Sequence, residues 1–114
     1  MSFVRLPFTS AGWTTGAHPL ERKNLAGDPS VALIEFAPGF EDPTWCARGH
    51  VIYVLDGTLE LALDDRAERV QAGDGCVIAP NTRHRARNPG GEPVRLFVMS
   101  PEHSVFLAAG SPGG

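Results

Sequence analysis

The sequence has 114 residues, 42% of them hydrophobic and 20% charged, which is the composition of an ordinary soluble globular protein. Its length allows one hydrophobic core and therefore a single domain. The formal net charge of −3 argues against a nucleic-acid-binding protein, which usually carries a basic face. No apolar run approaches the roughly 20 residues needed to cross a bilayer, so no membrane segment is expected.

The two cysteines, Cys46 and Cys76, bear on the cellular compartment. The N-terminus lacks the charged-then-apolar layout of a secretion signal, so we expect a cytoplasmic chain with reduced thiols. A disulfide between Cys46 and Cys76 is the alternative. Cys76 shares a strand face with Ile78, which favours a small core residue over a reactive thiol.

The first 30 residues are weakly patterned, and we expect short edge strands at 3–6 and 20–25 with a loop between them. The first clear strand follows at 31–36. Glu35 falls on the same face of it as Val31 and Leu33. Because an unpaired buried carboxylate is costly, a salt bridge to an arginine of a neighbouring strand is expected.

The most strand-like run, 51–55, directly follows a group of possible metal ligands. Thr44 and Cys46 are two residues apart, so they share a face of an extended chain, and His50 opens the strand. Trp45 points the other way, as a core or interface aromatic. The pair Asp56-Gly57 predicts a two-residue hairpin to an alternating strand at 58–63, since both central residues of that turn take positive φ.

His84 is the third candidate ligand. Residues 83–88 alternate strictly, with three arginines on one face (Arg83, Arg85 and Arg87). Three adjacent arginines must face water, which directs His84 inward. With further strands expected at 66–72, 76–79 and 94–99, the chain holds about eight to ten short strands and no helical period. This pattern predicts an all-β sandwich or barrel.

The region around His84 resembles the second motif of the cupins. Gly73, His84 and Asn88 fall at family positions. Ala79 replaces the family's proline, and Asn81 replaces its last glycine, where asparagine tolerates positive φ. The chain thus resembles a small single-domain cupin, which implies a double-stranded β-helix, or jelly-roll barrel.

The first cupin motif is present as a variant. Gly57 matches it, His50 stands at the glutamate position, and Cys46 and Thr44 stand at the two histidine positions. Because the family binds a divalent metal through these positions and the second-motif histidine, the resemblance implies Cys46, His50 and His84 as ligands. Thr44 would mark a weak or open position. A thiolate with two imidazoles suits Zn²⁺, with Fe²⁺, Ni²⁺ or Cu²⁺ as alternatives.

The resemblance implies a barrel at 31–100, flanked by N-terminal edge strands and loop at 1–30 and a C-terminal tail at 101–114. Two functions stay open. One is a metalloenzyme of the dioxygenase, isomerase or lyase type that acts on a small, partly apolar molecule. The other is a non-catalytic cupin that binds or senses a small ligand, with or without metal. The variant first motif transfers no activity, and Glu35 is the one acid–base group expected near the pocket.

Three further expectations follow. The run 51–55 is apolar on both faces, so its outer face needs a cover, which favours a homodimer. Protons should compete with the metal as the pH falls through the range where imidazoles titrate. The pocket should be largely apolar, with a lining formed by Ile52, Val54, Leu59, Leu61, Ile78, Leu96 and Val98.

Overall fold

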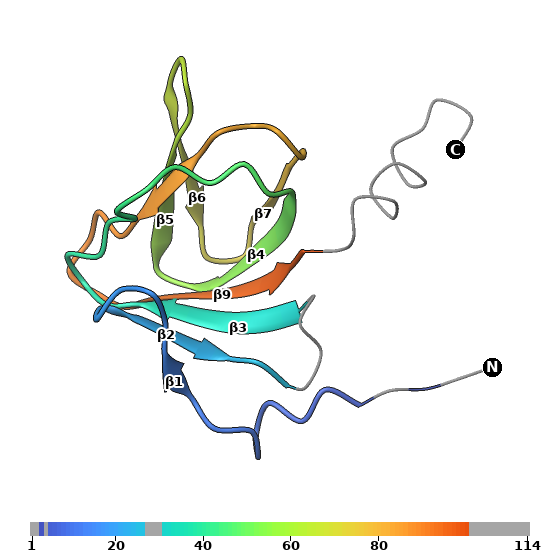
Figure 1. Cartoon of the computed structure of the whole chain (residues 1–114). Helices are drawn as coiled ribbons and strands as arrows, with labels where there is room; N and C mark the ends of the chain where they lie inside the picture. Colours follow the sequence, from blue (N-terminus) through green and yellow to red (C-terminus); the bar gives the residue numbers. More distant parts are fainter. Residues whose placement is uncertain (1–2, 4, 27–30, 101–114) are drawn as a thin grey trace.

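The computed structural model describes residues 3, 5–26 and 31–100. These residues form nine β-strands in two antiparallel sheets and no helix, so none of them belongs to a helix that could cross a membrane (Figure 1). The strands are β1 (Thr14–Thr15), β2 (Glu21–Asn24), β3 (Val31–Phe36), β4 (His50–Asp56), β5 (Thr58–Ala62), β6 (Ala67–Gln71), β7 (Gly75–Ile78), β8 (Arg85–Arg87) and β9 (Val94–Met99).

The larger sheet has six strands in the order β1-β2-β3-β9-β4-β7, and the smaller has three in the order β6-β5-β8. In Figure 1 the smaller sheet lies over one end of the larger one, and the two sheets together form the walls of the barrel. This arrangement confirms the predicted all-β jelly roll. Asn81 has a φ of 68°, as its place in the second motif predicted.

The core lies between the two sheets, because each long strand turns alternate apolar residues inward. The side chains of Val54, Leu59 and Val94 are fully buried. Phe40, in the loop after β3, is 1% exposed and stacks on Phe36 with ring centroids 4.0 Å apart. This stack closes one end of the core.

The predicted hairpin at Asp56-Gly57 is wrong. β4 pairs with β7 and β9, and β5 pairs with β6 and β8, so the two strands belong to different sheets. Of the two predicted turn residues, only Gly57 has a positive φ, of 78°. A Cβ atom at Gly57 would lie 2.7 Å from the carbonyl oxygen of Pro93. Gly57 therefore turns the chain from one sheet to the other.

The N-terminal segment covers part of the outer face of the larger sheet. Asn24 of β2 donates hydrogen bonds to the carbonyl oxygens of Phe8 and Ala11, and Phe8 packs edge-on against Phe97 of β9. The described residues of the predicted strand at 3–6 are not in a strand, while β1 lies in the predicted loop. The tail predicted at 101–114 lies outside the described residues.

Glu35 forms the predicted salt bridges and faces away from the barrel interior. Its Oε1 accepts a hydrogen bond from Arg22 of β2 at 2.7 Å, and its Oε2 accepts one from Arg95 of β9 at 2.9 Å. Burial raises the pKa of Glu35. The hydrogen bonds and positive charges of Arg95 and Arg22 together outweigh this effect, so the pKa is lowered overall. Glu35 is therefore a structural ion-pair residue and does not line the cavity described below.

Candidate metal centre

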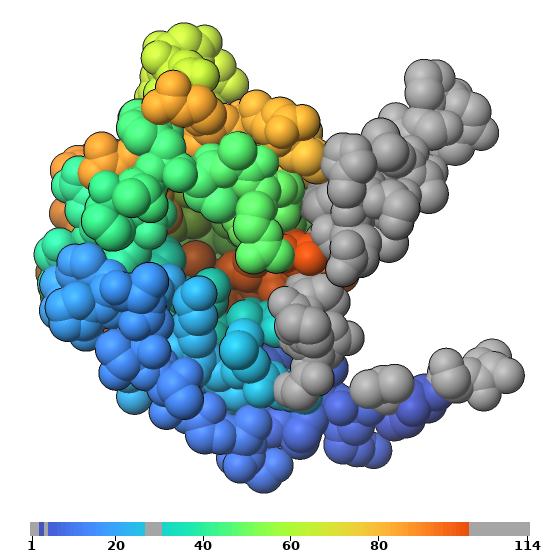
Figure 2. All heavy atoms as spheres, viewed as in Figure 1, coloured from blue at the N-terminus to red at the C-terminus, as the bar shows by residue number. Residues whose placement is uncertain are grey.

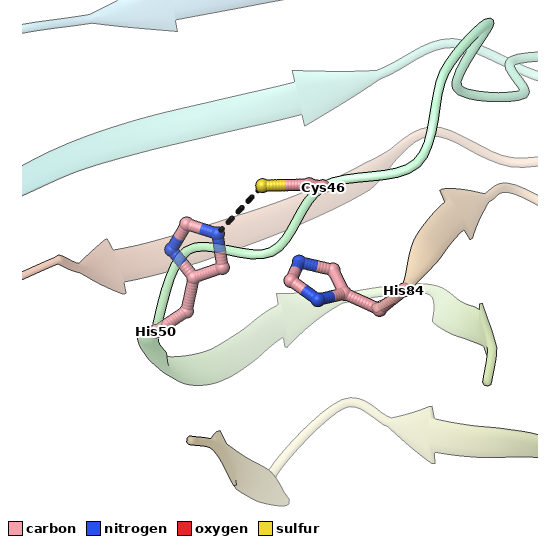
Figure 3. Close-up of side chains that lie close together, drawn as sticks. All are labelled: Cys46, His50 and His84. Atoms are coloured by element: carbon pink, nitrogen blue, oxygen red, sulfur yellow. Dashed lines mark hydrogen bonds between the residues drawn. The ribbon is translucent and has the colours of Figure 1, made fainter. Parts of the chain in front are cut away.

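Cys46 and His84 lie directly opposite each other at one end of the smaller sheet. Their backbones form an antiparallel bridge in which each N–H donates to the other carbonyl oxygen at 2.9 Å. Directly opposite residues of an antiparallel pair direct their side chains to the same face. The thiol and the imidazole both point into the barrel, and His84 is buried as predicted (Figure 3).

Thr44 does not reach this cluster. From the Glu41–Arg87 bridge to the Cys46–His84 bridge, one chain advances five residues (41 to 46) while the other moves back three (87 to 84). The two extra residues form a bulge with a bend at Thr44, which is exposed and does not line the cavity. The alternation that placed Thr44 beside Cys46 is therefore broken, and the structure does not bring Thr44 together with the other three predicted residues.

His50 completes the cluster from the larger sheet. It opens β4 on the inward face shared with Ile52, and its Nε2 lies 3.8 Å from Cys46 Sγ. The rings of His50 and His84 meet edge to face, with centroids 5.2 Å apart. One ligand atom each from Cys46, His50 and His84 lies within 4.8 Å of the others, and we call these three residues the metal cluster.

Hydrogen bonds orient both imidazoles toward the centre of the cluster. His84 Nδ1 lies 2.8 Å from the carbonyl oxygen of Thr82, which can only accept, so Nδ1 carries the proton and Nε2 keeps a free lone pair. His50 Nδ1 binds Ser100 Oγ at 2.6 Å, which leaves Nε2 facing Cys46. Such outer partners typically fix the ring orientation of metal-binding histidines.

The residue types of the metal cluster suit a tetrahedral ion. Zn²⁺ binds sulfur and nitrogen at about 2.0–2.3 Å, which places its ligand atoms roughly 3.3–3.8 Å apart. The distance between Cys46 Sγ and His50 Nε2 is 3.8 Å, at the upper end of this spacing, and all three donor atoms lie within 4.8 Å of one another. Cys46 Sγ also accepts the backbone N–H of Arg48 at 3.4 Å.

The pKa of His50 is lowered from its usual 6.5 to about 4. Burial is the main cause, because it disfavours the charged ring, and the charges of His84 (when it is protonated), Arg48 and Lys23 act in the same direction. His50 is therefore neutral, and able to bind a metal, down to about pH 4.

This shift makes a prediction for the metal-free protein. Between about pH 6.5 and pH 4, His50 binds a proton in the unfolded chain but not in the folded one, so unfolding takes up a proton. The free energy of unfolding should therefore fall as the pH drops through this range. Urea unfolding with a chelator present measures it. In a His50→Gln variant this part of the pH dependence should disappear, and an unchanged slope would contradict the shift.

The metal cluster opens into a cavity of about 200 Å³ inside the barrel. Figure 2 shows this face of the molecule hollowed between the green and blue segments, with the orange-red of β9 at the bottom. Five of the seven predicted apolar residues line the cavity, namely Ile52, Leu59, Leu61, Leu96 and Val98. Val54 and Ile78 are buried in the core instead.

The cavity also has a charged wall that the sequence patterns did not indicate. Its members are Glu21, Lys23, Asp42 and Arg48. Asp42 lies in the bulge before Cys46, where its backbone N–H donates to the carbonyl of Ala86 and its Oδ2 accepts the N–H of Ala86, each at 2.8 Å. Burial raises the pKa of Asp42, and the hydrogen bond and nearby positive charges offset only part of this rise. The alternation of the predicted strand 20–25 could have indicated that Glu21 and Lys23 point inward, because Arg22 between them points outward.

Cys76 and Trp45 lie outside the cavity. Both cysteines are free thiols, so a Cys46–Cys76 disulfide is not present. Cys76 packs against the core as predicted, and burial raises the pKa of its thiol. Trp45 is not a core residue, because it is 39% exposed, and the guanidinium groups of Arg83 and Arg85 lie over its ring.

The fold and the cluster together place the chain in a class of protein: small β-barrels with a candidate metal centre inside the barrel. The family model for the cupin domain, Cupin_2, matches residues 32–100, which is more than half of the chain. The chain therefore belongs to the cupin family.

Similar proteins include members of polyketide biosynthesis. "Polyketide synthase CurC" of Streptomyces cyaneus is 41% identical over 51 residues, which are 44% of this chain and 33% of that curated relative's length. The solved polyketide cyclase RemF from Streptomyces resistomycificus is 23% identical with a TM-score of 0.74, over 88% of this chain and 80% of RemF. KdgF from Halomonas sp. is 19% identical with a TM-score of 0.68, over 87% and 95% of the two chains. At these identities the solved structures show the fold alone.

Proposed function

We propose that the protein is a Zn²⁺-dependent enzyme of the isomerase, lyase or cyclase type that acts on a small molecule with an enolisable carbonyl group. The observation that carries this proposal is the joint placement of the metal cluster and Asp42 on one apolar cavity. The cavity volume of about 200 Å³ suits a molecule smaller than a typical drug-sized ligand. Similarity to a polyketide synthase and a polyketide cyclase supports a carbonyl substrate.

The metal cluster would hold the ion, and a bound Zn²⁺ supplies a Lewis acid for a carbonyl oxygen. The apolar lining excludes water from the substrate and orients its hydrocarbon part. Asp42 is the acid–base group: its carboxylate accepts a proton from the carbon beside the carbonyl and returns it to a carbon of the product. The raised pKa of Asp42, caused mainly by burial, makes it a stronger base than an exposed aspartate. The N–H of Ala86 holds this carboxyl in place.

Deuterium exchange tests the proposal without knowledge of the natural substrate. In D₂O, the Zn²⁺-loaded protein should accelerate exchange of the methyl protons of acetophenone, followed by ¹H NMR. Asp42→Asn should lower this rate about 100-fold, the usual contribution of a general base. Glu41→Gln is the matched control, because Glu41 is the exposed neighbour on the same segment.

The outcomes separate the two functional classes. Exchange no faster than with Zn²⁺ in buffer would exclude the catalytic role proposed for Asp42. Acetophenone binding without exchange would instead support the alternative of a non-catalytic cupin that binds a small ligand. Binding is measured on the same samples by line broadening of the acetophenone signals.

We further propose a homodimer formed through the outer face of β4, β7 and β9. The N-terminal segment covers the neighbouring part of this sheet, but Tyr53, Leu55, Val77 and Met99 remain exposed. Their apolar surfaces lie on adjacent strands, since Val51 of β4 is paired with both Val77 and Met99. In a dimer with a two-fold axis, this patch on one subunit would be covered by the same patch on the other.

Light scattering should give twice the chain mass of 12.2 kDa at micromolar concentration. Val77→Asp should produce a monomer, because Val77 is 69% exposed on this patch and a charge there would be desolvated in the dimer. Leu25→Asp, on an exposed leucine away from the patch, is the control. A wild-type mass of one chain would contradict the proposal.

A further inference from the structure

Lys23 is the only lysine in this sequence, and it lies on the wall of the cavity. It belongs to β2, where successive residues point to opposite faces of the sheet. Glu21 and Lys23 line the cavity, whereas Arg22 between them points outward and binds Glu35. The chain's one lysine side chain therefore lines the same cavity as the metal cluster.

The Lys23 ammonium group has no protein partner in the part of the chain that the structure describes, as neither a hydrogen bond nor an ion pair reaches it. The two carboxylates that share the cavity are held by backbone groups. Glu21 accepts the N–H of Ala17 at 3.1 Å, and Asp42 accepts the N–H of Ala86 at 2.8 Å. Lys23 is half-buried as a residue, and an anionic ligand atom in the cavity would form a charged hydrogen bond with its ammonium group.

Lys23 shares one cavity with both parts of the proposed site. Asp42 and all three residues of the metal cluster line the same cavity of about 200 Å³ as Lys23. At Asp42, burial raises the pKa, and the charge of Lys23 offsets part of that rise. One small molecule can therefore meet Lys23, Asp42 and the metal cluster together.

We propose that Lys23 is the anion-binding residue of the cavity and holds a carboxylate group of the substrate. The substrate class is then a small keto acid with an apolar body, whose carbonyl lies at the metal cluster and whose carboxylate lies at Lys23. This inference rests on the proposed function, which it extends by assigning the substrate class. Lys23 acts as a specificity-determining residue and takes no part in proton transfer.

Benzoate is a suitable probe, because it joins a carboxylate to a small apolar ring, and benzamide is its neutral counterpart. Isothermal titration of the Zn²⁺-loaded protein should show benzoate binding that weakens about 10-fold or more in Lys23→Met, as expected for loss of a charged hydrogen bond. Benzamide binding should not change. Arg22→Met is the matched control, since it removes the same charge from the same strand on the opposite face.

The single lysine permits a second measurement that does not depend on a variant. Reductive ¹³C-methylation labels Lys23 and the chain N-terminus only, and the Lys23 signal should shift on addition of benzoate but not of benzamide. Equal benzoate affinity in the wild type and Lys23→Met, or an unshifted Lys23 signal, would overturn the inference.

Metal content, measured by elemental analysis on the same samples, separates this inference from the proposed function. Full metal occupancy with benzoate binding that is insensitive to Lys23 overturns the anion site alone. Benzoate binding that requires Lys23 in a protein that takes up no metal supports the anion site and overturns the Zn²⁺-dependent function.

Discussion

Replacing His84 by alanine should remove most of the bound metal. The wild-type protein reconstituted with Zn²⁺ should hold about one ion per chain, measured by elemental analysis after gel filtration. His84 would supply one of three side-chain ligands, and it is the most buried of the three residues. Loss of an outer partner alone typically costs 10–100-fold in metal affinity, so loss of this ligand should cost more than about 100-fold.

Two controls test whether the effect belongs to the metal cluster. Thr44→Ala should keep full metal content, because Thr44 lies on the exposed bulge outside the cavity. His18→Ala removes a histidine whose Nδ1 accepts the N–H of Leu20, away from the cluster, and should also keep the metal. A wild type that stays metal-free after incubation with Zn²⁺, Fe²⁺, Ni²⁺ and Cu²⁺ would show that the three residues do not form a metal site.

Replacing Phe40 by alanine should cause the largest loss of folding stability. Phe40 is 1% exposed, stacks on Phe36 and receives the edge of His18 at 5.1 Å between ring centroids. Truncation of a fully buried phenylalanine costs about 3–5 kcal/mol, a large share of the roughly 5–15 kcal/mol by which such domains are stable. Urea unfolding monitored by circular dichroism measures this difference.

Phe3→Ala is the matched control for Phe40, because the side chain of Phe3 is 80% exposed. Its free energy of unfolding should stay within about 0.5 kcal/mol of the wild type. Comparable losses in the two variants would mean that the Phe36–Phe40 stack does not contribute to the core.

Strand positions and the inward direction of His84 could be predicted because both depend on local alternation. The strand 94–99 has its predicted bounds, and the arginines at 83, 85 and 87 correctly indicated the inner face of their strand. The three metal-cluster residues were predicted from the motif spacing, and the structure brings their donor atoms within 4.8 Å. In these cases the alternation seen in the sequence directly reflects the alternating side-chain directions of a pleated strand.

The remaining features depend on contacts between distant parts of the chain. Asp56-Gly57 has the composition of a hairpin turn, but whether two strands pair is decided by their neighbours, and β4 is already bonded to β7 and β9. The bulge that displaces Thr44 arises only when 41–46 aligns with β8. The charged wall joins residues from β2, the bulge and the loop before β4, so no single stretch of sequence contains its signal.

The metal cluster contains residues from two structural layers. Cys46 and His84 belong to the margin of the three-stranded sheet, and His50 belongs to the six-stranded sheet. An ion bound there would fasten the two layers together, as a crosslink does, and would resist their separation. Ligand entry into the cavity and local opening of this end of the barrel would then both depend on the metal–ligand bonds. The rate of local opening would therefore reflect how tightly the ion is bound.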